Sequence, residues 1–331
     1  MTNVQTVTGP IDAAELGRTL VHEHIRISYA GEELDRTYAW DRAETVARAV
    51  DKMAELLDAG FRTFVDPCPI ELGRDPELYA EIAQRSGMQI VCTTGFYTEH
   101  GGSGIPYYWR ARDPEEVAEH YVGELNEGIS DTGIRPGAIK AATGLEVTDA
   151  ERRMLTGAAI AQHETGVGII THTENSRHGD VQQDIFEAGG ADLARVLIGH
   201  QDEQEDVAPI RKLAERGTFV GIDRIGLELL APDERRVAHV STLVREGFAP
   251  HVCLSQDHIC ALTAPRPSFY IPPERREARA SMRDAIEWQV WKRPYTYIVT
   301  DFVPRLFERG VTEADVDTML VDNPRRLLAG M

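Results

Sequence analysis

The chain has 331 residues, with 42% hydrophobic and 27% charged residues, which is the composition of a folded globular protein rather than a disordered one. It contains 54 acidic and 35 basic residues, a formal net charge of −19. This balance argues against nucleic acids and anionic membranes as main partners, because both attract positively charged surfaces. The sequence shows no membrane-spanning run and no signal peptide, so we expect a cytoplasmic protein.

Short apolar runs rich in β-branched residues alternate with amphipathic helical patterns along the chain. The runs predict strands over Thr19–Ile25, Thr63–Pro67, Gln89–Tyr97, Gly137–Ala142, Gly168–Thr173, Arg195–His200, Thr218–Asp223 and His251–Gln256. The patterns predict helices over 41–59, 75–86, 113–129, 149–165, 178–189, 205–216, 233–247, 284–309 (interrupted by Pro294 and Pro304) and 312–329.

Eight strands alternating with helices predict a single (β/α)8 TIM barrel over residues 1–331. We expect residues 1–17 to form an N-terminal hairpin or lid at the bottom of the barrel, and 312–329 to form a C-terminal helix. A doubly wound open sheet is the alternative fold. Neither a dinucleotide-binding nor a phosphate-binding glycine motif follows any strand, and this removes the usual reason to prefer an open sheet.

Polar residues at the carboxyl ends of barrel strands converge on one site. Six side chains of this kind occupy the predicted strand ends: His22, His24, Lys140, His172, His200 and Asp257. Alone, each has a simpler explanation, such as a hydrogen-bonded core histidine or a carboxylate that caps a turn. Five of the six are residue types that bind metal ions, and all six lie at equivalent positions near the carboxyl ends of the strands. Together they predict a metal site.

Five such ligands are too many for one catalytic zinc ion, which usually keeps about three protein ligands and a water molecule. Two ions need a bridging group, and an ammonium cannot bridge because it has no lone pair. A neutral Lys140 that reacted with CO2 would carry a carbamate (N6-carboxylysine) with two anionic oxygens. We therefore expect two divalent transition-metal ions, with zinc favoured and cobalt, manganese or iron also compatible.

The sequence resembles the phosphotriesterase family of the amidohydrolase superfamily, and most of all its phosphotriesterase-like lactonases. The resemblance rests on the segments Leu16–His24, Thr94–Tyr97, Gly133–Lys140, Ile170–Thr173, Ile198–His200, Gly221–Arg224, Leu254–Asp257 and Asn323–Arg326. It implies that His22, His24 and Asp257 bind the buried ion and that His172 and His200 bind the exposed one. Carboxylated Lys140 would bridge the two ions, and the resemblance also implies a homodimer.

Two further residues resemble positions that line the site in the lactonases. Tyr97 follows the third strand and has the alternative role of a wall aromatic, and Arg224 follows the seventh and has the alternative of an ion pair with Glu203. Organophosphate-specialised members tend to carry histidine where this chain has Arg224. Residues 105–109 and 258–273 could form an apolar mouth for a substrate tail, or could be dimer contacts.

These observations predict a hydrolase that opens γ- and δ-lactones, including N-acyl-homoserine lactones (a quorum-quenching activity), with weak phosphotriesterase activity. A metal-bridging hydroxide would attack the carbonyl, Tyr97 would steady the oxyanion, and Asp257 would transfer the proton. The alternatives are a phosphotriesterase, or a hydrolase of a phosphorylated sugar lactone. A binding protein without activity would lack a ligand, and none is missing.

Overall fold

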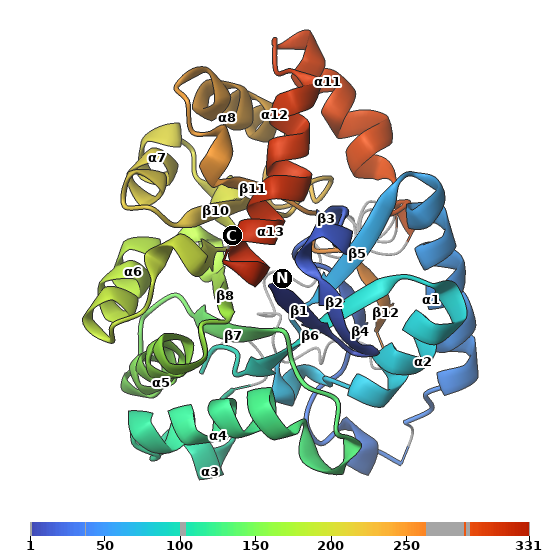
Figure 1. Ribbon diagram of the computed structural model, residues 1–331, viewed down its shortest axis with the longest axis vertical. Helices are drawn as coiled ribbons and strands as arrows, with labels where there is room; N and C mark the ends of the chain where they lie inside the picture. The colour runs from blue at the N-terminus through green and yellow to red at the C-terminus, as the bar shows by residue number, and fades with distance from the viewer. Residues whose placement is uncertain (1, 37, 100–103, 263–287, 289–291, 331) are drawn as a thin grey trace, which may run out of the picture.

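A computed structural model describes residues 2–36, 38–99, 104–262, 288 and 292–330. Eight parallel strands form one sheet in the order β3-β5-β6-β7-β8-β9-β10-β11, surrounded by helices (Figure 1). The sheet curls into a nearly closed barrel, and the predicted (β/α)8 fold is confirmed. No helix in these ranges is long and apolar enough to span a membrane.

The barrel strands are β3 (Arg18–Leu20), β5 (Phe61–Asp66), β6 (Gln89–Gly95), β7 (Ala138–Thr143), β8 (Gly168–Thr173), β9 (Val196–Ile198), β10 (Phe219–Ile222) and β11 (Val252–Leu254). Two small sheets accompany them: β1 (Asn3–Thr6) with β2 (Gly9–Asp12), and β4 (His24–Ile27) with β12 (Ile259–Leu262). The helices are α1 (Arg42–Asp58), α2 (Pro76–Ser86), α3 (Tyr107–Arg110), α4 (Pro114–Glu127), α5 (Asp149–Thr165), α6 (Gly179–Ala188), α7 (Val207–Glu215), α8 (Asp233–Arg245), α11 (Val303–Glu308), α12 (Glu313–Asp317) and α13 (Asn323–Ala329).

The first predicted strand, Thr19–Ile25, is wrong, because the structure divides this segment between two separate strands. The barrel strand β3 ends at Leu20, and His24 opens β4, which pairs in parallel with β12 outside the barrel ring. Between them, the backbone N–H of His22 donates to the Ser255 hydroxyl at 3.0 Å. The N–H of Glu23 donates to the Val65 carbonyl at 3.0 Å. These bonds to neighbouring strands break the regular alternation that the sequence suggested.

The gap between β3 and β11 is closed by a buried side chain rather than by a strand ladder. The Glu23 carboxyl group accepts hydrogen bonds from the Ser255 hydroxyl at 2.9 Å and from the backbone N–H groups of Gln256 and His258 at 2.7 and 2.8 Å. Burial raises the pKa of Glu23 to about 8, while these donors act in the opposite direction. One carboxyl group therefore ties the first and last strand ends together beneath the site.

The interior of the barrel is filled from both chain ends. Inward-facing residues such as Val65, Ile170 and Phe219 form one core cluster with Val4 of β1 and Leu327 of α13. Both termini accordingly lie over the centre of the barrel in Figure 1. The apolar core closes the amino end of the barrel and leaves its carboxyl end for polar groups.

The helices begin where capping residues satisfy free backbone groups. At α5 the Thr148 side chain accepts a hydrogen bond from the N–H of Glu151, whose carboxylate accepts one from the N–H of Thr148. The predicted helix over 284–309 lies partly outside the described residues. Its remainder includes a π-helical turn, Ile298–Phe302, followed by α11, and Pro304 lies in the first turn of α11.

Candidate metal centre

All eight residues that the sequence singled out line one cavity of about 210 Å³ at the carboxyl end of the barrel. They are His22, His24, Tyr97, Lys140, His172, His200, Arg224 and Asp257. Its other described lining residues are mainly apolar or aromatic: Ile27, Tyr29, Pro69, Leu72 and Ile259. The eight come from loops and strands far apart in sequence, and the barrel brings every one of them together.

The candidate ligands face one another at short range. Nε2 of His22 lies 3.4 Å from Nζ of Lys140, and Nε2 of His24 lies 3.3 Å from Oδ1 of Asp257. Nε2 of His200 lies 3.9 Å from the other oxygen of Asp257. The His172 and His200 rings have centroids 4.6 Å apart, and so have those of His22 and His200. These nitrogen and oxygen atoms surround a shared space.

Two of these residues, His200 and Asp257, lie beyond the ends of the strands in the structure, in left-handed backbone. Strand β9 ends at Ile198 and β11 at Leu254, whereas His200 has φ 56° and Asp257 has φ 47°. This backbone conformation is uncommon for residues other than glycine. Where it occurs, often at functional sites, contacts with the surrounding structure stabilise it. At His200 the support includes a bond from its own backbone N–H to Asp223 Oδ1 at 2.9 Å.

The protonation behaviour of the buried groups fits a metal centre. Burial, joined by the nearby Lys140 charge, lowers the pKa of both His22 and His172 to about 4, so both imidazoles are neutral as metal binding requires. Burial also lowers the pKa of Lys140 to about 8, which favours the neutral amine that can take up CO2. For His24, hydrogen bonds to Asp257, Asp66 and Cys68 outweigh burial and raise the pKa, so an ion bound there displaces a proton.

The donor geometry points to the same conclusion. Among the described residues, three groups of side chains could hold an ion: His22, His24 and Asp257; His22, His200 and Asp223; and His24, Asp66 and Cys68. The Nδ1 atoms of His22 and His24 are buried and face carboxylates, those of Asp223 and Asp66 respectively. A ring of buried imidazole nitrogens with nearby carboxylates suits divalent transition metals.

Sequence reasoning missed the carboxylates that stand behind these histidines. Asp223 lies 2.8 Å from His200 Nδ1 and 3.2 Å from His22 Nδ1, and Asp66 lies 3.4 Å from His24 Nδ1. Both are fully buried. Each comes at or directly after the end of a barrel strand, and this position was the available signal.

Arg224 has both of the roles that the sequence left as alternatives, because it lines the cavity and forms an ion pair with Glu203. Its Nε donates to Oδ2 of Asp257 at 3.0 Å, and its Nη1 forms an ion pair with Glu203. Burial opposes ionisation of Asp257, but the hydrogen bond from His24 and the electrostatic effects of nearby His200 and Arg224 hold the pKa of Asp257 well below its usual range. Arg224 therefore connects a candidate ligand to a carboxylate at the rim.

Tyr97 lines the cavity beside His172. Its hydroxyl oxygen lies 3.3 Å from Nε2 of His172, and its backbone N–H donates to the buried Glu71 carboxyl group at 2.7 Å. His172 also contacts Glu174, at 3.1 Å, which the sequence did not single out. The hydroxyl is thus held inside the cavity by contacts at both ends of the residue.

The expected apolar mouth is only partly described. Residues 263–273 lie outside the described residues. Residues 105–109 include α3, on which Tyr107 and Tyr108 are exposed, and none of these five residues lines the cavity. The apolar wall that is described comes instead from β4 and the residues after it, from the loop after β5, and from β12.

Comparisons with known proteins agree with this geometry. The model of the phosphotriesterase family matches residues 2–328. The chain belongs to this family. A phosphotriesterase homology protein of Mycobacterium tuberculosis is 35% identical over 99% of this chain and 98% of that protein.

Two solved structures from Deinococcus radiodurans are similar throughout. An organophosphorus hydrolase has a TM-score of 0.89 and 37% identity, covering 99% of this chain and 97% of that one. A mutant of a phosphotriesterase-like lactonase has a TM-score of 0.88 and 37% identity, covering 98% and 99%. The resemblance seen in the sequence is confirmed, and the chain is a metal-dependent hydrolase that acts on ester bonds, from a family of binuclear metal enzymes.

Proposed function

We propose that this enzyme opens lactone rings at a centre that holds two divalent metal ions. His22, His24 and Asp257 would hold one ion, His172 and His200 the other, and carboxylated Lys140 would be shared between them. When bound, the two ions supply Lewis-acid activation of the carbonyl group and lower the pKa of water toward neutrality. The cavity geometry, the neutral histidines and the lowered Lys140 pKa support this assignment.

Asp257 transfers the proton. Its carboxylate accepts a proton from the attacking water and returns it to the alkoxide that leaves as the ring opens, so no proton is gained or lost overall. Arg224 orients this carboxylate through its 3.0 Å hydrogen bond, and its ion pair with Glu203 fixes the guanidinium in turn. The three side chains are only 12–15% exposed, and the two contacts together keep the carboxylate in one orientation through the reaction.

The observation that carries the choice of a lactone is the Arg224 bridge between Asp257 and Glu203, at a position that, by the resemblance seen in the sequence, lines the site in the lactonases. Tyr97 adds to it, because a hydroxyl held inside the cavity can donate a hydrogen bond to a planar carbonyl oxygen as charge develops there. The apolar wall formed by Ile27, Leu72 and Ile259 suits the carbon skeleton of a neutral ring.

The test compares substrates on one metal-replete preparation. We expect kcat/KM for the best γ- or δ-lactone, in a panel that includes N-acyl-homoserine lactones, to exceed that for paraoxon by at least about 100-fold, or roughly 2.7 kcal/mol in the transition state. Paraoxon should still be hydrolysed weakly. The matched control Asp257→Asn should lower kcat for both substrates by roughly 10²–10⁴, which assigns the two activities to this site.

Hydrolysis of paraoxon faster than every lactone in the panel would reject the proposal. Organophosphate hydrolysis would then be the main activity, as the name of the similar organophosphorus hydrolase suggests for that protein. Activity that Asp257→Asn leaves unchanged would belong to another site or to a contaminant.

A further inference from the structure

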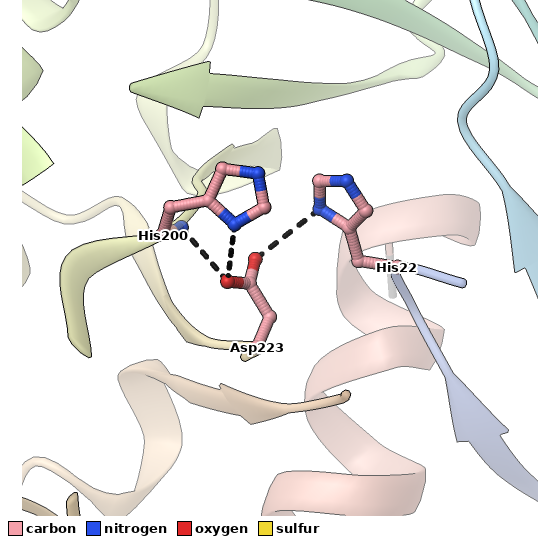
Figure 2. Close-up of side chains that lie close together, drawn as sticks. All are labelled: His22, His200 and Asp223. Carbon is pink, nitrogen blue, oxygen red and sulfur yellow. Dashed lines mark hydrogen bonds and ion pairs between the residues drawn. The ribbon is translucent and has the colours of Figure 1, made fainter. Parts of the chain in front are cut away.

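Asp223 lies between two of the candidate metal ligands. It directly follows β10, is fully inaccessible to solvent, and points into the space between His22 and His200 (Figure 2). Oδ1 accepts hydrogen bonds from His200, from the backbone N–H at 2.9 Å and from Nδ1 at 2.8 Å. The other oxygen, Oδ2, lies 3.2 Å from Nδ1 of His22. One carboxylate thus contacts both imidazoles on the side facing away from the cavity.

His22 and Asp223 are each other's only available partner at these atoms. Nδ1 of His22 and Oδ2 of Asp223 are both buried, and neither has another hydrogen-bond partner among the described residues. A carboxylate accepts hydrogen bonds and donates none, so it favours the tautomer in which each ring carries its proton on Nδ1. The lone pair of each ring then lies on Nε2.

The two Nε2 atoms point toward the other candidate ligands. That of His22 lies 3.4 Å from Nζ of Lys140, and that of His200 lies 3.9 Å from Oδ2 of Asp257. The tautomer that Asp223 selects is therefore the one that directs both lone pairs into the cavity. A carboxylate in this position also makes the imidazole a better metal ligand.

The backbone around this carboxylate is shaped to admit it. A Cβ atom at Gly221 would lie 2.4 Å from Oδ2 of Asp223, and one at Gly199 would lie 3.1 Å from the same oxygen. Neither glycine has a positive φ, so backbone conformation does not explain glycine at these positions. At Gly221, space for the Asp223 side chain explains it, whereas at Gly199 a Cβ atom would first meet the Thr171 carbonyl oxygen, at 2.2 Å.

We propose that Asp223 is a positioning residue that couples the two metal positions, because its single carboxylate fixes one histidine of each. The inference rests on the proposed function, which assigns His22 to one ion and His200 to the other. Its consequence is that disturbing Asp223 weakens the binding of both ions, although the proposed function assigns Asp223 as a ligand to neither.

The experiment measures metal affinity rather than activity. Metal-free wild-type enzyme and variants are titrated with Co²⁺ in the presence of bicarbonate, and stoichiometry and dissociation constants are followed by calorimetry and by the visible absorption of bound Co²⁺. We expect two equivalents for the wild type. In Asp223→Asn, one amide oxygen and an NH2 donor replace the two carboxylate oxygens, so only one of the two imidazoles keeps an acceptor. We expect the Co²⁺ dissociation constants of both metal positions to rise by about 10- to 100-fold.

Two further variants separate this role from general damage. Gly221→Ala keeps the charge of Asp223 but displaces its carboxylate, and it should weaken both ions in the same direction. The matched control Asp233→Asn alters a carboxylate that is equally buried and pairs with Arg236 at 2.7 Å but contacts no imidazole, so it should bind Co²⁺ like the wild type. Circular dichroism establishes that each variant is folded, and if Asp223→Asn does not fold, Gly221→Ala decides alone.

The outcomes distinguish the inference from the proposed function. Wild-type affinities in a folded Asp223→Asn or Gly221→Ala enzyme would overturn the coupling role while leaving the binuclear centre intact. Weakening of one ion alone would also overturn it. If the wild type bound three equivalents of Co²⁺, Asp223, His22 and His200 would bind the third ion, and Asp223 would be a ligand rather than a positioning residue. One equivalent or none in the wild type would reject the proposed function, and the inference with it.

Discussion

Glu71 is a buried carboxyl group that holds the loop carrying Tyr97. It is 2% exposed, and its Oε1 accepts a hydrogen bond from the Tyr97 N–H at 2.7 Å. Its Oε2 has no hydrogen-bond partner among the described residues. Burial raises the pKa of Glu71 from 4.5 to about 7, against the effect of that N–H donor and of Arg74. In the folded protein this side chain therefore stays protonated up to about pH 7, whereas in the unfolded chain it loses its proton near pH 4.5.

This shift predicts a pH-dependent stability. Because the folded pKa is raised, the contribution of Glu71 is fully present below about pH 4.5 and is lost as the pH rises through about 7. In Glu71→Gln, which cannot ionise, the fall in unfolding free energy between about pH 5 and about pH 7 should be smaller than in the wild type, by up to about 3 kcal/mol. Urea unfolding at several pH values measures it.

The control for Glu71→Gln is Glu119→Gln on the exposed face of α4, which should keep the wild-type pH profile. If Glu71→Gln also kept that profile, Glu71 would be ionised throughout, and its role in holding the Tyr97 loop would be that of a carboxylate.

At the residue scale, sequence alone located the side chains that line the cavity but not those that orient them. Histidine, lysine and aspartate at strand ends can be recognised as candidate site residues, because the carboxyl ends of the strands of a (β/α)8 barrel meet at one site. Glu71 and Asp223 act through partners from other loops, 26 residues away for Glu71 and Tyr97. An acidic residue beside a turn has the same local signature whether it caps that turn or supports a distant ligand.

At the scale of elements, Gly95 controls how closely two barrel strands approach at Lys140. It ends β6, pairs with Lys140 of β7, and has φ 124°. A Cβ atom there would lie 1.9 Å from the Lys140 carbonyl oxygen. Both the left-handed backbone and the close contact therefore require glycine, directly beside the residue proposed to bridge the ions.

Gly95→Ala should lower the unfolding free energy by at least about 2 kcal/mol, because positive φ and backbone overlap both oppose a side chain. It should also weaken Co²⁺ binding, since the strand that carries Lys140 must move. The control Gly87→Ala, with φ 79° but no atom within 4 Å, isolates the cost of the backbone conformation and should be milder. Equal losses in the two variants would mean that contact with Lys140 contributes nothing.

The limits of sequence reasoning at this scale are clearest in the first strand. Its apolar pattern runs through His22 to Ile25, and the sequence predicted one continuous strand over Thr19–Ile25. The chain instead leaves the barrel after Leu20 and starts β4 at His24, because Ser255 and Val65 bind the intervening backbone. Both histidines still line the cavity, but through a bend formed by long-range hydrogen bonds.

At the scale of the whole molecule, the formal charge of −19 surrounds a cavity that contains Arg224 and the proposed ligands. A neutral lactone approaches this surface without electrostatic cost, and its carboxylate product is repelled from it. A phosphorylated sugar lactone would instead be repelled on approach. The eight-strand alternation and this net charge could both be obtained from the sequence, and the net charge favours an uncharged substrate.

The net charge predicts how the rate depends on salt. Raising NaCl from about 0.01 M to about 1 M shortens the screening length from about 30 Å to about 3 Å. For a neutral lactone, kcat/KM should change by less than about 2-fold over this range, while for a lactone carrying a phosphate group it should rise by about 10-fold or more. Bound metal is measured at each salt concentration, so that loss of ions is not mistaken for screening. If the phosphorylated lactone were the better substrate at low salt, a local basic site would have to outweigh the net charge of the protein. The phosphorylated sugar lactone would then replace the neutral lactone as the preferred substrate class.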